Sequence, residues 1–354
     1  MKRITLALVL LMFFNPLVLL SANLFAIALS GSAEEIQEAI EAGADVNEKT
    51  AEGWTPLMFA TSLNRDPAVP LLLILAGAEV DARDSDGLSP LMYAAWANGN
   101  PDILSVLIMM GSEVDARDDD GQTPLMYSAH YNTHAEVSLL LLDAGAEVEA
   151  RSDNGMTPLM YAAKGNRNAA VLSTLIQAGA QVGAKRDDGM TALMLAAREN
   201  AYEEVVSTLI EAGADVNERS EGGLSPLMFA AFSNTSAQVV SALLAAGANM
   251  NARDPFIGST PLMLAAHANT NPEVVSTLIE AGARLDVSDI MGLTPLMVAA
   301  RYNTNAEVLW VFIEAGSDLQ AMDANGKTAF DHCQDNPAIK GTAPYWQLSD
   351  ARFM

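Results

Sequence analysis

The chain has 354 residues, half of them apolar, which is too apolar for a disordered protein and enough for one or two ordinary domains or a single elongated one. Its 44 acidic side chains outnumber the 19 basic ones, giving a formal net charge of -25 at pH 7. A field this negative repels phosphate backbones and anionic lipids, which argues against nucleic acid as a partner. The charge either keeps a long surface soluble or attracts a basic partner.

The first residues have the pattern of a secretory signal peptide. Lys2 and Arg3 precede an apolar stretch that is interrupted once and ends at small residues, the last of which is Ala22. This pattern predicts a leader over residues 1–22 and a mature domain over residues 23–354, located in the periplasm or secreted. The alternative is an uncleaved inner-membrane anchor, although the interrupted run is short for a bilayer span of about 20 residues.

Cys333 is the only cysteine, so an intrachain disulfide is excluded. Nothing near it in the sequence marks a base-activated thiol. We therefore expect Cys333 to be a small core residue, and we expect packing alone to hold the fold.

The tetrapeptide Thr55-Pro56-Leu57-Met58 recurs along the chain with threonine or serine in its first position. Successive copies are 34 residues apart, except for one step of 35 between Ser225 and Thr260. A fixed period of this length is typical of a repeat protein, in which each unit buries its apolar face only against its neighbours. The copies begin at Thr55, Ser89, Thr123, Thr157, Thr191, Ser225, Thr260, Thr294 and Thr328.

In chain order, the sequence predicts an N-terminal cap, eight full repeats and a C-terminal cap. The N-terminal cap covers residues 23–50. The C-terminal cap covers residues 324–354, and its tail with Tyr345 and Trp346 is expected to cover the exposed side of the last unit. The full repeats cover residues 51–84, 85–118, 119–152, 153–186, 187–220, 221–255, 256–289 and 290–323.

Each full repeat predicts two helices and a turn. The hydroxyl of a residue such as Thr55 caps the first helix, and proline usually takes the first helical position. This helix ends at an asparagine such as Asn98, which we expect to be a left-handed cap. The second helix, which begins at Asn100-Pro101 in one copy, ends at a glycine such as Gly77. A second glycine, such as Gly53, marks a hairpin-like turn.

These residues resemble the ankyrin repeat, whose signature includes a Thr-Pro-Leu-His-x-Ala helix start and a Gly-Ala-Asp-Val-Asn exit. The resemblance covers nearly the whole mature chain. It implies an all-α solenoid of stacked helix-turn-helix units joined by short hairpin-like loops. Two features depart from the family: the usual period is 33 residues, and methionine replaces the family's histidine.

The eight methionines that replace this histidine form a ladder. Thioethers bind soft metals such as Cu(I), but successive rungs should lie about 8 to 10 Å apart, too far to share one ion. We therefore interpret them as semi-buried filler between stacked helices. They are Met58, Met92, Met126, Met160, Met194, Met228, Met263 and Met297.

Other patterns that resemble metal sites do not meet the chemical requirements. His130 and His134 are four residues apart, but Asn132 should end the helix between them and leave His134 at the cap of the next helix. The segment Asp118-Asp119-Asp120-Gly121 lacks the glutamate of a calcium loop, so we interpret it as a solvated hairpin tip. With no nucleophile elbow, phosphate loop or catalytic dyad in the sequence, we predict neither enzyme activity, nor a metal, nor a cofactor.

The resemblance implies that a partner binds in a concave groove lined by hairpin tips and the first helices. The residues that vary among the copies at these positions include aromatic and arginine side chains, which are enriched at binding hot spots. Drift at exposed sites would give a similar pattern. The aromatic residues Phe59, Tyr93, Tyr127, Tyr161 and Phe229 fit either the core or the groove. The predicted groove residues are Trp54, Trp96, His130, Tyr131, Lys164, Arg198, Phe232, His267, Arg301 and Tyr302.

The sequence thus predicts a monomeric, exported module that binds a protein partner through this groove. A narrower hypothesis is an inhibitor or immunity-type protein that neutralises a basic exported enzyme or toxin. The alternative from another class is a membrane-anchored structural rod of the envelope with no dedicated groove partner.

Overall fold

The computed structural model describes residues 21–352, which contain twenty helices and no strand. This part of the chain divides into two compact units, one ending at Glu147 and one beginning at Val148. The predicted leader lies outside the described residues up to residue 20, and its last two residues begin the first helix described, α2. No helix between residues 21 and 352 is long and apolar enough to span a membrane.

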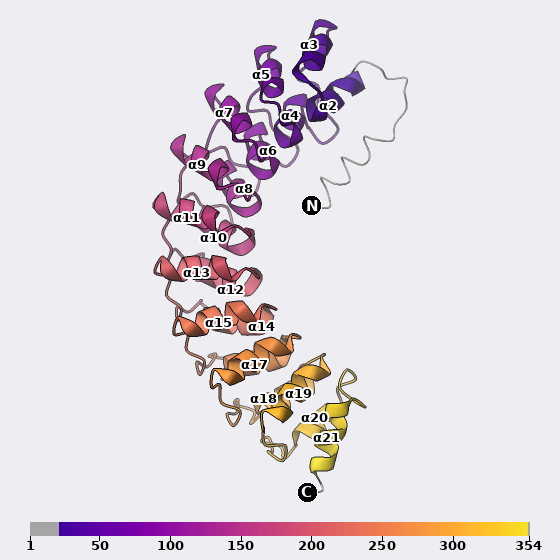
Figure 1. The fold of residues 1–354 in the computed structure, drawn as a ribbon, viewed down its shortest axis with the longest axis vertical. Coiled ribbons are helices and arrows are strands. Elements are labelled where there is room, and N and C mark those ends of the chain that lie inside the picture. Colours follow the sequence, from indigo (N-terminus) through magenta and orange to yellow (C-terminus); the bar gives the residue numbers. More distant parts are fainter. Residues whose placement is uncertain (1–20, 353–354) are drawn as a thin grey trace. The chain divides into compact units, whose positions relative to one another are not determined.

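In the first unit, the helices form two rows (Figure 1). The helices α2, α4, α6 and α8 pack against their neighbours in one row, and α3, α5, α7 and α9 form the other. The bounds are α2 Ser21–Ser30, α3 Ala33–Glu41, α4 Pro56–Leu63, α5 Ala68–Leu75, α6 Pro90–Ala97, α7 Pro101–Met109, α8 Pro124–Tyr131 and α9 Ala135–Asp143.

The second unit repeats this arrangement (Figure 1). Its first helices are α10 Pro158–Gly165, α12 Ala192–Glu199, α14 Pro226–Ser233, α16 Pro261–Ala268, α18 Pro295–Tyr302 and α20 Ala329–Cys333. Its second helices are α11 Ala169–Gln177, α13 Glu203–Glu211, α15 Ala237–Ala245, α17 Pro272–Glu280, α19 Ala306–Glu314 and α21 Ala343–Ala351. The fold is therefore the all-α solenoid that the repeat predicts.

The helix starts confirm the predicted caps and explain the methionines. The Ser89 side chain accepts a hydrogen bond from the backbone N–H of Met92 at 3.3 Å, and the N–H of Ser89 points back at the Met92 sulfur at 3.4 Å. Methionine thus takes the place that glutamate holds in an ordinary capping box. The prediction of semi-buried methionines was wrong, since the eight ladder side chains are at most 1% exposed.

The asparagines that end the first helices have a different role from the predicted one. Asn98 has φ -88° and ψ 124°, which is extended backbone and not the left-handed cap that we expected. Its side-chain N–H groups donate to the carbonyls of Thr61 and Asn64 in the preceding repeat, at 3.1 and 2.8 Å. Its side-chain oxygen accepts from the N–H of Asn100. Each such asparagine therefore joins one repeat to the one before.

This asparagine ladder recurs because burial leaves these carbonyls no water to bond. Neighbouring rungs are also linked to each other, since each donates to the backbone oxygen of the asparagine before it. Rungs with these bonds are Asn64, Asn98 and Asn132 in the first unit, and Asn200, Asn234, Asn269, Asn303 and Asn336 in the second. Asn64 contacts the first helix pair and Asn336 belongs to the C-terminal cap, so the ladder includes both ends of the array.

The acidic hairpin turns also differ from the prediction of solvated tips. Asp118 is 9% exposed, and its carboxylate accepts from the N–H groups of Asp120 and Gln122 and from the hydroxyl of Tyr127. Only the following Asp119 and Asp120 are exposed. The first aspartate therefore shapes the turn, and the later ones carry the surface charge.

The C-terminal cap packs α21 against α19 and α20, as predicted for the tail. Tyr345 is buried 5.1 Å from the ring of Phe330, whereas Trp346 remains 58% exposed. Cys333 is buried, and burial raises the pKa of its thiol to about 12, as expected for a core residue.

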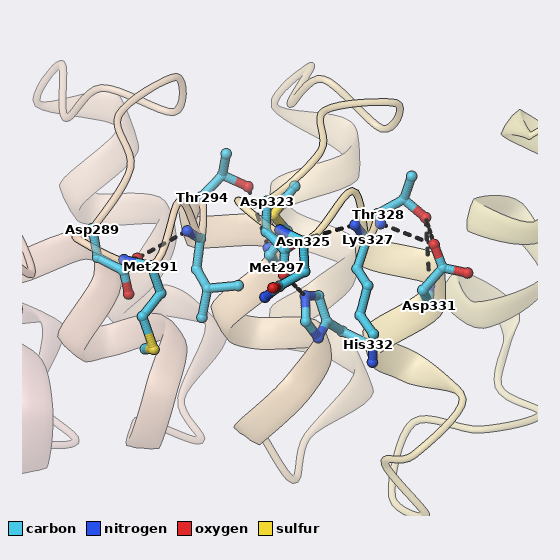
Figure 2. Close-up of polar contacts among 11 residues, drawn as sticks. Asp289, Met291, Thr294, Met297, Asp323, Asn325, Lys327, Thr328, Asp331 and His332 are labelled. Atoms are coloured by element: carbon cyan, nitrogen blue, oxygen red, sulfur yellow. Dashed lines mark hydrogen bonds and ion pairs between the residues drawn. The ribbon is translucent and has the colours of Figure 1, made fainter.

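A buried polar pair stands in the same cap (Figure 2). His332 Nε2 lies 3.1 Å from Asp323 Oδ2, and both side chains are at most 4% exposed. Burial by itself would raise the pKa of Asp323. Hydrogen bonds from the N–H groups of Lys327 and Asn325, and from His332, outweigh burial and lower it.

This lowered pKa predicts a loss of stability in acid. The charged Asp323 contributes fully above the ordinary aspartate pKa of about 3.9, and its contribution disappears as the pH falls through the lower folded-state pKa. We expect Asp323→Asn to be less stable than the native chain at neutral pH, with the difference shrinking below about pH 4. Urea unfolding of both proteins over this pH range measures it. A difference that stayed constant down to the acid limit would contradict the assignment.

Candidate functional site

The structure divides the ten predicted groove residues between the two units. Trp54, Trp96, His130 and Tyr131 belong to the first unit, and the other six belong to the second. Trp54 precedes α4, and the remaining nine lie at the ends of first helices. All ten are half-buried or exposed, so each is accessible on its own unit.

In the first unit, an aromatic row runs across three successive repeats. We define it as Trp54, Tyr93, Trp96, Tyr127 and Tyr131. Trp54 lies 4.6 Å from Tyr93, Tyr93 stacks on Trp96 at 6.3 Å, and Trp96 lies 5.8 Å from Tyr127 and 5.3 Å from Tyr131, all between ring centroids. Tyr131 is 50% exposed at the end of the row.

The two buried tyrosines support this row. Tyr93 donates to Asp84 and Tyr127 to Asp118, each at 2.5 Å, so both rings are held by the hairpin turn of their own repeat. Burial and these hydrogen bonds raise the pKa of both tyrosines, which keeps the hydroxyls protonated as donors. Buried Phe59, Tyr93, Tyr127 and Tyr161 are therefore core residues, and Phe229 is half-buried. Trp54, Trp96 and Tyr131 form the accessible edge.

In the second unit, part of the predicted groove is charged. Glu199 lies between two predicted residues, with Lys164 Nζ 3.6 Å and Arg198 Nη2 3.2 Å from its carboxylate oxygens. These side chains are between 30% and 44% exposed, so solvent screens the pairs and they contribute little to stability. Their charges remain accessible to a partner.

Further along the second unit, four side chains form a mixed cluster. Phe232 stacks on His267 at 6.1 Å, and His267 lies 4.7 Å from Tyr302, between ring centroids. The Arg301 guanidinium stands 5.0 Å from the centre of the Tyr302 ring. Partial burial lowers the pKa of His267, so its ring is neutral at pH 7 and contributes as an aromatic surface.

These surfaces offer flat contact area and not a reaction centre. Among residues 21–352, no three histidine, cysteine or carboxylate side chains are grouped to hold a metal ion. His130 and His134 are separated by the helix end at Asn132, as predicted, and the His134 ring lies 3.1 Å from the Asn132 side-chain oxygen. A hollow of about 250 Å³ in the second unit lies away from the predicted residues, lined in part by Leu285, Thr294 and Ser317.

Sequence reasoning missed one exposed apolar feature. Phe256 and Ile290 are each 72% exposed at two successive hairpin tips, and their neighbours Ile257 and Met291 are each 40% exposed. The signal was the single 35-residue step, which adds one residue to the first of these tips. Apolar letters at a position that is acidic in the preceding three repeats would have marked it.

Two rows of short helices, linked by buried asparagines and presenting aromatic and charged side chains, define a repeat-type binding scaffold. The family described as ankyrin repeats (3 copies) matches residues 24–118, 91–186, 141–220, 163–254 and 227–323, and these overlapping matches span most of the chain. The chain belongs to the ankyrin repeat family, whose members are protein–protein interaction modules and are generally not enzymes. A comparison with curated proteins gives no match.

Proposed function

We propose that this ankyrin repeat protein is exported and binds a folded protein partner, with the aromatic row of the first unit as its main contact. The observation that carries this proposal is the contiguous set of rings at Trp54, Trp96 and Tyr131, spaced 4.6 to 6.3 Å along the row. Tryptophan and tyrosine dominate binding hot spots because they bury a large area at little entropic cost.

The buried tyrosines beneath the row favour a preorganised site. Because Tyr93 and Tyr127 are fixed by Asp84 and Asp118, the rings that they support lose little further freedom when a partner binds. The mixed cluster around Phe232 and Tyr302 is a second candidate contact, on the second unit.

The charge favours a basic partner. Between residues 21 and 147, the first unit carries 21 acidic side chains and 4 basic ones. Two of these bases are already used in the scaffold, since Arg83 donates to the carbonyls of Gly87 and Arg117, and Arg117 donates to Gly121. A basic exported enzyme or toxin would be attracted to this unit, and its capture should slow as salt is added.

Alanine variants of the row test the binding site. The native chain, Trp96→Ala and Tyr131→Ala serve as bait in envelope and culture fractions, with Leu75→Ala as the control. Leu75 is 67% exposed in the same unit but on the second-helix row. We expect Leu75→Ala to capture the same protein as the native chain, and the two row variants to bind it roughly tenfold or more weakly. Equal capture by all four would overturn the site assignment.

Export rests on the sequence pattern before Ser21. Sequencing the N-terminus of the purified protein tests it, with a start at Asn23 expected for a cleaved leader. A retained Met1 in the membrane fraction would instead support the rival function, an anchored structural rod of the envelope. In that case the row variants should also leave the protein's interactions unchanged.

A further inference from the structure

The hairpin tips of the second unit carry a segregated pattern that the proposed groove does not use. The same position in five successive tips, two residues before the turn glycine, is exposed in every copy. It is acidic in the first three and apolar in the next two. In chain order it is occupied by Asp153, Asp187, Glu221, Phe256 and Ile290. We call these five residues the tip row.

Direct contacts make the tip row one continuous edge. The N–H of Glu221 donates to the carbonyl of Asp188 at 3.0 Å, and the N–H of Ile290 donates to the carbonyl of Ile257 at 3.0 Å. The acidic and apolar parts meet where Gly223 packs against the ring of Pro255.

Local hydrogen bonds explain why the apolar tips stay exposed and ordered. The buried carboxylate of Asp254 accepts from the N–H groups of Phe256, Ile257 and Ser259, which closes the longer loop. The Arg253 guanidinium donates to the carbonyls of Gly258 and Ser288, which braces this tip against the next one. The loop therefore presents Phe256 and Ile257 outward instead of folding them onto the core.

From this pattern we infer that the tip row is a second interaction surface, which binds an extended polypeptide segment with basic residues in one half and apolar residues in the other. The three carboxylates complement the basic half. Phe256 and Ile290, widened by Ile257 and Met291, cover the apolar half. This surface does not include any of the ten groove residues, so it goes beyond the proposed function.

Spacing gives the register of such a segment. Stacked helices lie about 10 Å apart, and an extended chain advances about 3.3 Å per residue, so every third residue of the segment faces the next tip. A lipid surface fits the row less well, because three carboxylates in line with the apolar tips repel anionic headgroups.

A designed peptide tests the inference. The probe is a fluorescein-labelled peptide of about 14 residues, with lysine at every third position in one half and leucine at every third position in the other. A peptide of identical composition, in which lysine and leucine alternate, is the matched probe. Fluorescence anisotropy measures the binding of both to the native full-length chain. We expect the segregated peptide to bind roughly tenfold more tightly than the alternating one.

Variants assign the contact to the tip row. Phe256→Ser with Ile290→Ser, and Asp187→Asn with Glu221→Gln, should each weaken binding of the segregated peptide roughly tenfold. Tyr202→Ser, at a residue 41% exposed in the same unit, and Phe232→Ala in the groove should leave it unchanged. Because all these side chains are exposed, circular dichroism should show unaltered folding.

Several results would overturn the inference. Equal binding of both peptides would reduce the effect to net charge. Binding to phosphatidylcholine vesicles that disappears in Phe256→Ser with Ile290→Ser would make the apolar tips a lipid contact. Concentration-dependent dimerisation that disappears in the same variant would make the second copy the occupant. Loss of peptide binding in Phe232→Ala would assign the effect to the groove of the proposed function.

Discussion

Asn234→Asp should destabilise the second unit more than any surface substitution in it. The Asn234 side chain donates to the carbonyls of Ala197 and Asn200 at 2.9 and 2.8 Å, and its oxygen accepts from the N–H of Ser236 at 2.9 Å. Aspartate has the same shape but no N–H, so it places a buried carboxylate against two carbonyl oxygens. We expect a loss of about 3 to 5 kcal/mol in the free energy of unfolding.

Asn234→Ala separates the lost hydrogen bonds from the added charge. It removes the same three bonds without introducing an acid, so we expect an intermediate loss of about 2 to 3 kcal/mol. Asn251→Ala, at an exposed position in the same unit, is the control and should change stability by less than about 0.5 kcal/mol. Urea unfolding followed by circular dichroism measures all three. Equal stabilities for the aspartate and control variants would remove the ladder's structural role.

Met92→Ala should lower the free energy of unfolding of the first unit by about 2 to 5 kcal/mol, because it opens a cavity in a fully packed site. Met92 is completely buried between the helices on either side of α6. The extra consequence here is that the N–H of Ser89 loses the sulfur acceptor at 3.4 Å. Urea unfolding measures the sum of both effects.

Leucine variants isolate the sulfur contact. Met92→Leu keeps the volume and removes only the acceptor, and volume-conserving swaps alone cost less than about 1.5 kcal/mol. Met228, equally buried in the second unit, has no such sulfur contact with Ser225, so Met228→Leu is the matched control. We expect the Met92 change to cost more than the Met228 change. The reverse order would show that the thioether acts only as filler.

Much of this architecture is readable from the sequence because it depends on local chemistry. The 34-residue period, the Thr-Pro helix starts and the glycines after the second helices place nearly every helix within its observed bounds. Gly77, for instance, has φ 99°, a backbone conformation that disfavours other residues whatever packs nearby. The candidate groove residues were also identified as accessible from their position in the repeat alone.

The sequence by itself therefore determined the family, the helical repeat and its boundaries, since caps and turns act within a few residues. Only the tertiary structure decided that Asn98 bonds the preceding repeat, that Met92 accepts from a helix cap and that Asp118 holds Tyr127. It also decided which rings meet along the aromatic row and that the tips at Phe256 and Ile290 adjoin. Most of these contacts join side chains to groups about one period away, and no local pattern specifies whether a polar group there meets water or a neighbouring backbone.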